Sequence, residues 1–394
     1  MLGHTRQFLD KITYSWPWLS RYPLQRIPQW FKQLSAFENP QHIIITVANH
    51  FEPSWDKHKT PLSWTAQRKR VDHWCVQAIA LGKAVRDHDG TPFRHTNFFP
   101  AEQAHDLLLE KLAELQTEGF GEVEIHLHHG VDKPDNAENL RHSLVEFRDL
   151  LADEYGFLSR QPQALIPRYA FVHGNLALAN SKNGKCCGVD SEMQILAETG
   201  CYADFTLPAV PEESQVAKIN AIYQCGHPLD ERAPHRSGPN LKVGDTPQLP
   251  ILVTGPVMFD WTRRKSGVPF PRVDDGILAQ NYPLNIGRLQ RWQRAGISVQ
   301  GRPDWVFIKL YCHGFFDHDQ PQMIGDGMRQ FWEEALERAD DTNSFKVHFA
   351  SAREVFNMIK AATDGRTGNP HQYRDYWLQP IMQSKHKQQY AMAT

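Results

Sequence analysis

The chain has 394 residues, of which 41% are hydrophobic and 22% are charged, a composition typical of a folded soluble protein and not of a disordered one. Its formal net charge of −2 argues against general electrostatic binding of nucleic acid. No apolar run reaches the roughly 18 residues of a transmembrane helix, and the N-terminus lacks the basic start and apolar run of a signal peptide.

Six cysteines are spread over the chain without a C-x-x-C pair, which does not indicate a disulfide framework. We therefore expect a reduced, cytoplasmic compartment. The adjacent Cys186 and Cys187 are expected to be packing residues, and the alternative is that they ligate a metal or are redox-active.

Residues 1–41 differ from the rest of the chain. Aromatic, basic and proline residues are interleaved in Trp16-Pro17-Trp18, Arg21-Tyr22-Pro23 and Trp30-Phe31-Lys32. The prolines are incompatible with one long helix through this segment. We expect an extension that wraps over the outside of the folded body. The alternative is an arm that docks peripherally on a membrane surface or on a partner, since Trp and Arg are common at interfaces.

From residue 42 to 362, segments with strand pattern alternate with segments with helix pattern. The predicted strands cover 43–48, 93–99, 122–128, 169–172, 202–207, 250–255, 305–311 and 345–349. The predicted helices cover 63–86, 104–117, 136–155, 190–199, 284–295, 323–339 and 351–362. This alternation predicts an α/β fold with a parallel sheet. The Pro- and Gly-rich residues 208–248 indicate an inserted loop region, and 363–394 a weakly patterned tail.

Polar and apolar residues alternate over 122–128, which is the pattern of a β-strand. On such a strand Glu124, His126 and His128 point to one face, and Asp132 follows in the loop beyond. Carboxylates and imidazoles are costly to bury without partners, and together they suit zinc and similar divalent ions. The alternative is a half-exposed strand whose histidines face solvent.

Four predicted strands end in clusters that carry histidine, namely Asn49-His50, His128-His129, His173 and His313. In β/α folds the loops that follow the strands converge at the strands' carboxyl ends. We therefore expect these histidines to contribute to one functional site.

The order of the motifs is similar to that of a known family. A strand ending in polar residues is followed by Thr96-Asn97-Phe98-Phe99, then by Glu124-Ile125-His126-Leu127-His128, and later by a strand that carries His313. This pattern resembles the polysaccharide deacetylase (NodB-homology) branch of the glycoside hydrolase/deacetylase superfamily over roughly residues 42–362. The resemblance implies an incomplete or irregular (β/α)7-type barrel, with 1–41 as an N-terminal extension.

That family holds a divalent metal, often zinc, with one Asp and two His. Carried over by position, the resemblance implies His50, His128 and Asp132 as the metal ligands. The family's catalytic base falls on Asn49, which cannot take a proton. Glu52 is the nearest carboxylate in the sequence and is then the candidate base, and the alternative is a solvated loop carboxylate.

The resemblance also assigns His313 to the family's late-strand histidine, which acts as general acid, while the alternative is a core histidine bonded to the backbone. Asn49, His126, His173 and Asn175 are the candidates for contacts with a substrate. The alternative for His126 is that it is a further metal ligand or that it supports one.

These features predict a metal-dependent hydrolase acting on a carbohydrate, with removal of an acetyl group as the leading reaction. Water activated by the metal would attack the acyl carbon, and His313 would protonate the leaving group. One alternative is a glycosidase, which needs two carboxylates, such as Glu52 with Asp132 or Glu124, on either side of the scissile bond. The other is a non-catalytic relative that binds a glycan or a partner in polysaccharide metabolism.

Overall fold

The computed structural model describes residues 2–27, 40–55, 61–265 and 267–385. Its centre is a nine-stranded sheet in the order β13-β1-β2-β3-β5-β6-β8-β7, with β14 also paired to β1. The strands are β1 (Gln41–His50), β2 (His95–Pro100), β3 (Gly121–Leu127), β5 (Tyr169–His173), β6 (Cys201–Asp204), β7 (Ile222–Gln224), β8 (Ile251–Val253), β13 (Trp305–His313) and β14 (Phe345–Phe349). All neighbours are parallel except β7 and β8. This confirms the predicted α/β class with a mostly parallel sheet.

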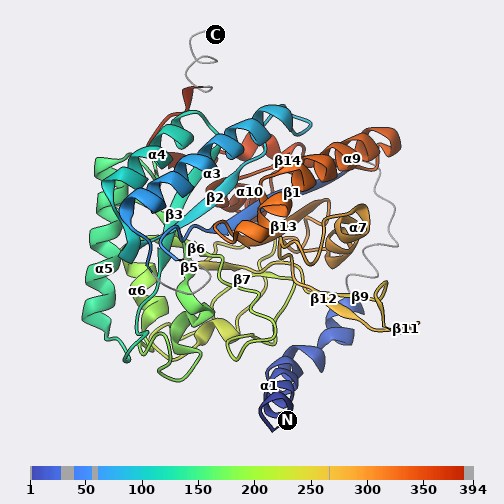
Figure 1. Ribbon diagram of the computed structural model, residues 1–394, viewed down its shortest axis with the longest axis horizontal. Helices are drawn as coiled ribbons and strands as arrows, with labels where there is room; N and C mark the ends of the chain where they lie inside the picture. The colour runs from blue at the N-terminus through green and yellow to red at the C-terminus, as the bar shows by residue number, and fades with distance from the viewer. Residues whose placement is uncertain (1, 28–39, 56–60, 266, 386–394) are drawn as a thin grey trace.

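Helices follow most of the strands and pack around the sheet (Figure 1). They include α3 (Trp64–Ala84), α4 (Asp106–Thr117), α5 (Ala137–Asp149), α6 (Glu192–Thr199), α7 (Ile286–Ala295), α9 (Asp326–Thr342) and α10 (Ala352–Thr363). Several begin where the sequence offers a cap, because the side chains of Ser63 and Asn136 accept hydrogen bonds from backbone N–H groups of the first turn. The helices therefore lie within a few residues of the predicted segments.

The alternating residues of β1 pack into two different cores. Ile43, Ile45 and Val47 belong to a cluster that includes α3 and α4, whereas Ile44 and Ala48 belong to a second cluster that includes α10. We call these two sides the outer face and the inner face of the sheet. A parallel strand that is buried on both faces is apolar throughout, which explains the uninterrupted apolar run in this strand.

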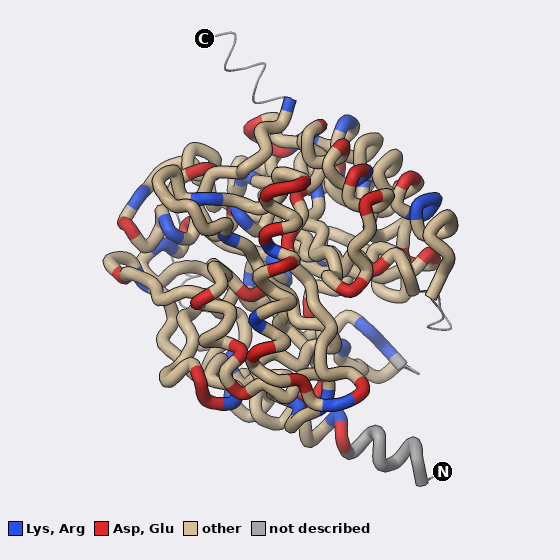
Figure 2. The backbone as a smooth tube through the Cα atoms, turned by 90° about the vertical axis from the view of Figure 1, so that its left-hand side faces the viewer, with Lys and Arg blue, Asp and Glu red and all other residues tan. Residues whose placement is uncertain are grey.

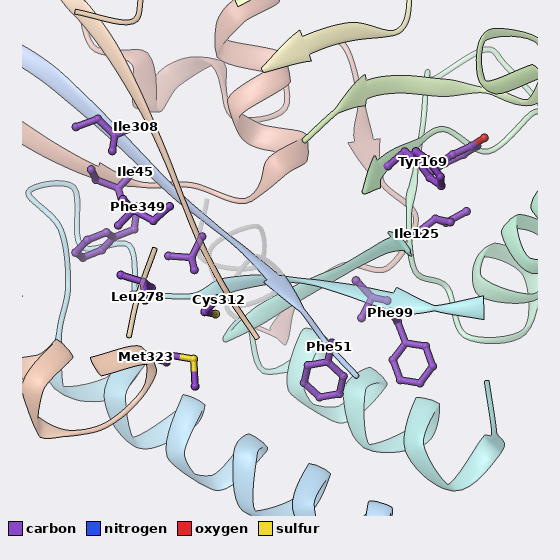
Figure 3. Close-up of a cluster of buried hydrophobic side chains, with 14 of the residues drawn as sticks. Ile45, Phe51, Phe99, Ile125, Tyr169, Leu278, Ile308, Cys312, Met323 and Phe349 are labelled. Carbon is purple, nitrogen blue, oxygen red and sulfur yellow. The ribbon is translucent and has the colours of Figure 1, made fainter. Parts of the chain in front are cut away.

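The strand β3 has the faces that its alternating sequence predicts. Val123, Ile125 and Leu127 pack in the outer core, where Figure 3 shows Ile125 among the neighbouring apolar side chains. Glu124 and His126 are also buried, and by alternation they lie on the inner face. The polar side of this strand is therefore turned into the protein and not toward solvent.

The predicted loop region 208–248 contains β7, which forms the antiparallel edge of the central sheet. Small two-stranded ladders not predicted from the sequence join β9 (Met258–Asp260) to β12 (Arg272–Asp274) and β10 (Arg264–Lys265) to β11 (Val268–Pro269). In the C-terminal tail, β15 (Gln379–Pro380) pairs with β4 (Ser159–Arg160). The guanidinium of Arg374 forms ion pairs with Asp87 and Glu354, so this part of the tail is fixed to the body.

Residues 2–27 of the N-terminal extension form two helices. α1 (Leu2–Leu19) contains Pro17 near its end, the chain turns at 20–21, and a second helix covers 22–27. Trp18 is 1% exposed, and its ring lies 5.8 Å from that of Phe259 between centroids. The end of α1 thus packs against β9. The predicted aromatic run Trp30-Phe31-Lys32 lies outside the described residues.

Among the described residues, no helix is long and apolar enough to cross a membrane. Acidic and basic residues are interspersed along the chain in Figure 2. This distribution fits the small net charge of the sequence.

Candidate metal centre on the inner face

Parallel strands bring several of the predicted residues to one edge of the sheet. His50 ends β1 and lies opposite His313 of β13 in the strand register. The ring of His50 is 4.6 Å from that of His313 and 5.0 Å from that of His126 between centroids. With two residues from the adjoining loops, these histidines form a group that we call the inner cluster. It consists of His50, Glu52, His126, His128 and His313.

Glu52 is the centre of the inner cluster. Its Oε1 atom lies 3.0 Å from Nε2 of His126, 3.6 Å from Nε2 of His128 and 3.9 Å from Nδ1 of His50. Burial raises the pKa of Glu52, but the hydrogen bond and the charge of His126, together with the charges of His313 and His128, outweigh burial and hold it below its usual range. Glu52 is therefore an ionised carboxylate facing three imidazole nitrogens.

The other ring nitrogens of two of these histidines are already engaged. Nδ1 of His126 lies 2.7 Å from the carbonyl oxygen of Val172, and Nδ1 of His128 lies 2.6 Å from Oε1 of Glu102. A carbonyl oxygen only accepts hydrogen bonds, and so does an ionised carboxylate, so each Nδ1 carries the hydrogen. A neutral ring then presents its Nε2 lone pair to the oxygen of Glu52. Two acceptors facing one another require a cation between them, either a proton on the ring or a metal ion.

The protonation of the remaining histidines favours ligation. Burial, with the charges of His313 and His126, lowers the pKa of His50 well below its ordinary value. Burial also lowers the pKa of His313, against the opposing charge of Glu52. Near pH 7 both rings are neutral, which is the form that binds a metal. The pKa of His128 is raised instead, because Glu102 and Glu52 outweigh its burial, so a proton competes with a metal for this ring.

The donor set fits a divalent ion. His50, Glu52 and His126 each offer a ligand atom, and these atoms all lie within 4.8 Å of one another. Two imidazoles and a carboxylate are a ligand set typical of zinc sites that keep a position open for water or substrate. The carbonyl of Val172 and the carboxylate of Glu102 are the kind of partners that fix the orientation of a ligating histidine.

The inner cluster is accessible at its rim. The side chains of Glu52 and His128 are 17% and 18% exposed. A surface cleft of about 820 Å³ lies beside them, and His128 is the member of the inner cluster that lines it. Glu102 and Asp132 also line this cleft. A small solute can thus approach the cluster from the side of His128.

A second part of the rim is aromatic. Phe316 is 46% exposed, and its ring stacks on that of His313 with an interplanar angle of 10° and a centroid distance of 5.0 Å. Arg70 of α3 donates hydrogen bonds to the backbone oxygens of Pro53 and Trp55, and to that of Phe315. The loops after β1 and β13 are therefore held together beside the site.

Other predicted residues are not brought into the inner cluster. Asp132 is exposed in the loop after β3, and among the described residues it belongs to no group with metal-ligand geometry. Asn49 is fully buried and bonds to Asn97. Successive side chains of a strand point to opposite faces, so Asn49 and His50 cannot both face the inner side.

The residues after β5 also lie elsewhere. His173 is fully buried, and its ring packs on that of His129, with 4.8 Å between centroids. Asn175 is exposed in a loop, where its carbonyl oxygen accepts a hydrogen bond from Lys182.

Glu102 is a member of the site that the sequence did not single out. It belongs to the short helix η1 (Ala101–Gln103) directly after β2. The sequence did contain a sign of Glu102, because a carboxylate that directly follows a predicted strand is a candidate site residue. It was not singled out because this strand carries no histidine at its end.

Neither a scan against models of protein families nor a search of curated proteins finds a match to this chain.

Proposed function

We propose that the chain is a metal-dependent hydrolase that removes acyl groups from a carbohydrate, with deacetylation as the leading reaction. The observation that carries this proposal is the convergence of three imidazole nitrogens on one oxygen of Glu52, at the carboxyl ends of parallel strands. In a β/α fold this edge is where reacting groups gather.

His50, Glu52 and His126 would hold the ion and leave a position open for water or substrate, with His128 beside it as a donor that a substrate can displace. This set keeps His50 and His128 from the ligands implied by the family resemblance, and it takes its carboxylate from Glu52 in place of Asp132. Once bound, a divalent ion such as zinc supplies Lewis-acid chemistry that lowers the pKa of water and polarises a carbonyl group. Glu52 then acts as a ligand, and another group must carry the proton.

His313 is suited to that proton transfer. Its ring is neutral near pH 7 and partly exposed at the rim of the inner cluster. It can take a proton from the attacking water and return it to the departing oxygen or nitrogen, as a general base and then a general acid. The stacked ring of Phe316 holds the plane of this imidazole, so the proton is delivered from a defined position.

The surroundings of the inner cluster support a sugar as the substrate. The exposed ring of Phe316 offers an apolar face beside the reacting groups. The adjoining cleft is lined by hydrogen-bonding side chains, among them Asp132, Asn136, Asn139 and Ser143. A flat apolar face next to several donors and acceptors matches a ring that carries hydroxyl groups.

We also infer that the sheet curls into an incomplete barrel, as in the family that the sequence resembles. The ammonium group of Lys309 on β13 donates hydrogen bonds of 2.8 and 2.5 Å to the carbonyl oxygens of Phe205 and Leu207, which follow β6. A Cβ atom on Gly255, just after β8, would lie 2.6 Å from the carbonyl oxygen of Lys309. Strands that are distant in the sheet order are thus close across the inner face.

The glycosidase alternative is supported less well. Glu124 is fully buried and accepts hydrogen bonds from the hydroxyl of Tyr202 and the backbone N–H of Ala170. Its burial raises its pKa to about 8, so it is protonated at neutral pH and has no access to a substrate. Glu124 therefore cannot pair with Glu52 as the two carboxylates that glycoside hydrolysis needs on either side of the scissile bond.

The proposal is tested by measuring metal content and acetate release together. Protein purified without chelator is analysed for bound metals and is incubated with chito-oligosaccharides and with O-acetylated xylan. We expect a bound divalent ion and acetate release that chelator abolishes. His126→Ala should lose acetate release and bind less metal than the wild type, whereas His142→Ala, whose side chain is 73% exposed on α5, should match the wild type in both.

Two results would overturn the proposal. Protein without a stoichiometric divalent ion would remove its basis. A metal-loaded protein that binds these glycans but releases no acetate would support the non-catalytic alternative.

A further inference from the structure

A second group of metal-ligand side chains lies on the outer face of the sheet. His129 follows β3, His173 ends β5, Cys187 lies in the next loop and Glu192 begins α6. All four residues are buried, and each offers a ligand atom within 4.8 Å of those of the others. We call these four residues the outer cluster.

Glu192 is at the centre of the outer cluster. Its Oε1 atom lies 3.2 Å from Nε2 of His129 and 3.5 Å from Nε2 of His173. Its Oε2 atom lies 3.6 Å from Sγ of Cys187. The two imidazoles and the thiol therefore face one carboxylate that has no exposure to solvent.

His173 leaves a buried lone pair without a donor. Its Nδ1 is in close contact with the carbonyl oxygen of Gly174, which can only accept, so the hydrogen of a neutral ring is on Nδ1. Its Nε2 has no hydrogen-bond partner although it points toward the oxygen of Glu192. Buried polar atoms are rarely left unsatisfied. A cation between Nε2 and the carboxylate would satisfy both.

The chain around the outer cluster is strained and closely packed. Between β5 and α6, non-glycine residues with positive φ include Asn175, Ala179, Asn180 and Cys186, a conformation that L-residues adopt at a cost unless the surroundings hold it. The backbone N–H of Asp135 donates to the carbonyl oxygen of Cys187 over 2.7 Å. Two loops and a helix start thus meet at the four side chains.

We propose that His129, His173, Cys187 and Glu192 hold a second divalent ion, of the zinc class, which joins these loops to α6 and has a structural role. Two imidazoles, a thiolate and a carboxylate are four ligands that suit zinc and leave no position open for a substrate. On binding, a sulfur–metal bond forms, and the thiol proton of Cys187 is released to solvent. The carboxylate of Glu192 has no exposure to solvent, whereas that of Glu52 in the inner cluster is partly exposed.

A sulfur ligand gives this site a signature that the inner cluster cannot produce. Apoprotein prepared with a chelator is refilled with Co²⁺, and the absorption spectrum is examined for sulfur-to-cobalt charge transfer. We expect this band in the wild type and in Cys186→Ser, a matched control in the neighbouring residue. It should be absent in Cys187→Ser. It should persist in Glu52→Gln, so the test is independent of the proposed hydrolase activity.

A second measurement needs neither a variant nor removal of the ion. X-ray absorption at the zinc edge of the wild-type protein, loaded during expression in zinc-supplemented medium, should show a sulfur neighbour at about 2.3 Å. Zinc neighbours that are nitrogen and oxygen alone would overturn the proposal. A cobalt charge-transfer band that survives in Cys187→Ser would overturn it as well.

Discussion

The inner and outer clusters are built from nearly the same groups and differ in their access to solvent. Each has a glutamate that faces at least two imidazoles. The side chain of Glu52 is 17% exposed and lies beside a cleft, whereas that of Glu192 is not exposed. Chemistry on a substrate requires access, so the difference assigns reaction to the inner cluster and stability to the outer one.

The two clusters also differ in how the chain supports them. Three histidines of the inner cluster lie in β1, β3 and β13 or end these strands, and their positions are set by the strand register. In the outer cluster Cys187 lies in an irregular loop, and the carboxylate of Glu192 accepts a hydrogen bond from the backbone N–H of Ala179 in that loop. The conformation of the loop therefore depends on its buried side chains to a greater extent than the conformation of the strands does.

The largest expected effect is a loss of stability on Glu192→Gln. Removing this fully buried charge leaves the imidazoles of His129 and His173 without their common partner, which typically costs about 3–5 kcal/mol of unfolding free energy. Denaturant unfolding measures the loss. Glu198→Gln, at an exposed position of the same helix, should change stability by less than about 1 kcal/mol. Equal unfolding midpoints for the two variants would show that the outer cluster does not have the stabilising role assigned to it.

The next effect separates activity from stability. Glu52→Gln should lower the rate of acyl hydrolysis by about 10³-fold, equivalent to roughly 4 kcal/mol, because the inner cluster loses its only carboxylate. Its unfolding free energy should change less than that of Glu192→Gln, since Glu52 is partly solvated. Glu212→Gln, 55% exposed, is the control. Full activity in Glu52→Gln would show that Glu52 is not needed.

A smaller effect is expected at Glu102, which touches the inner cluster through a ring nitrogen. Its carboxylate lies 2.6 Å from Nδ1 of His128 and orients that ring. Glu102→Gln keeps an acceptor but removes the charge, so the affinity of the inner cluster for metal should fall by about 10- to 100-fold. Competition with a chromophoric chelator measures this. An unchanged affinity would mean that His128 does not contribute to binding.

The smallest expected effect is a pH dependence of stability caused by Glu124, a buried carboxylate of the inner face that has no imidazole beside it. Burial raises its pKa from 4.5 to about 8, so the folded protein holds a proton that the unfolded chain has released. Between these two pH values stability falls as pH rises, by at most about 1.4 kcal/mol per pH unit. Unfolding measured from pH 5 to pH 8 should show this slope in the wild type and a weaker one in Glu124→Gln. Identical slopes would exclude the shift.

The arrangement of the sheet could be predicted from the sequence because its cause is local. Uninterrupted apolar strands between amphipathic helices leave few alternatives to a parallel sheet. The alternation in 122–128 likewise predicts which side chains share a face. Strand ends in parallel sheets lie at one edge, which is why His50, His128 and His313 could be placed near one another.

The sequence pattern could not predict which residue at the end of β1 faces the inner side of the sheet. Asn49 and His50 are neighbours in a strand, so one turns to each face, whereas the family resemblance placed both in one site. The same applies to His173, which shares its face with Phe171 in the outer core. Which residue of such a pair faces inward depends on strand register, and register is set by packing across the whole sheet.

The sequence pointed to His129, His173 and Cys187 separately, but it did not join them into one site and gave no sign of Glu192. Glu192 follows His129 by 63 positions, and Cys187 lies in a loop whose path depends on positive φ angles at several non-glycine residues. No periodic pattern connects such positions. A cluster formed by loop geometry can be recognised only after the chain has been folded.

Anomalous X-ray diffraction can show whether the inner cluster holds a divalent ion. Crystals of protein purified without chelator are measured on both sides of the absorption edge of the metal found by elemental analysis. We expect an anomalous peak bounded by His50, Glu52 and His126. Ordered side chains with Glu52 hydrogen bonded to a protonated His126, and no peak between them, would contradict it.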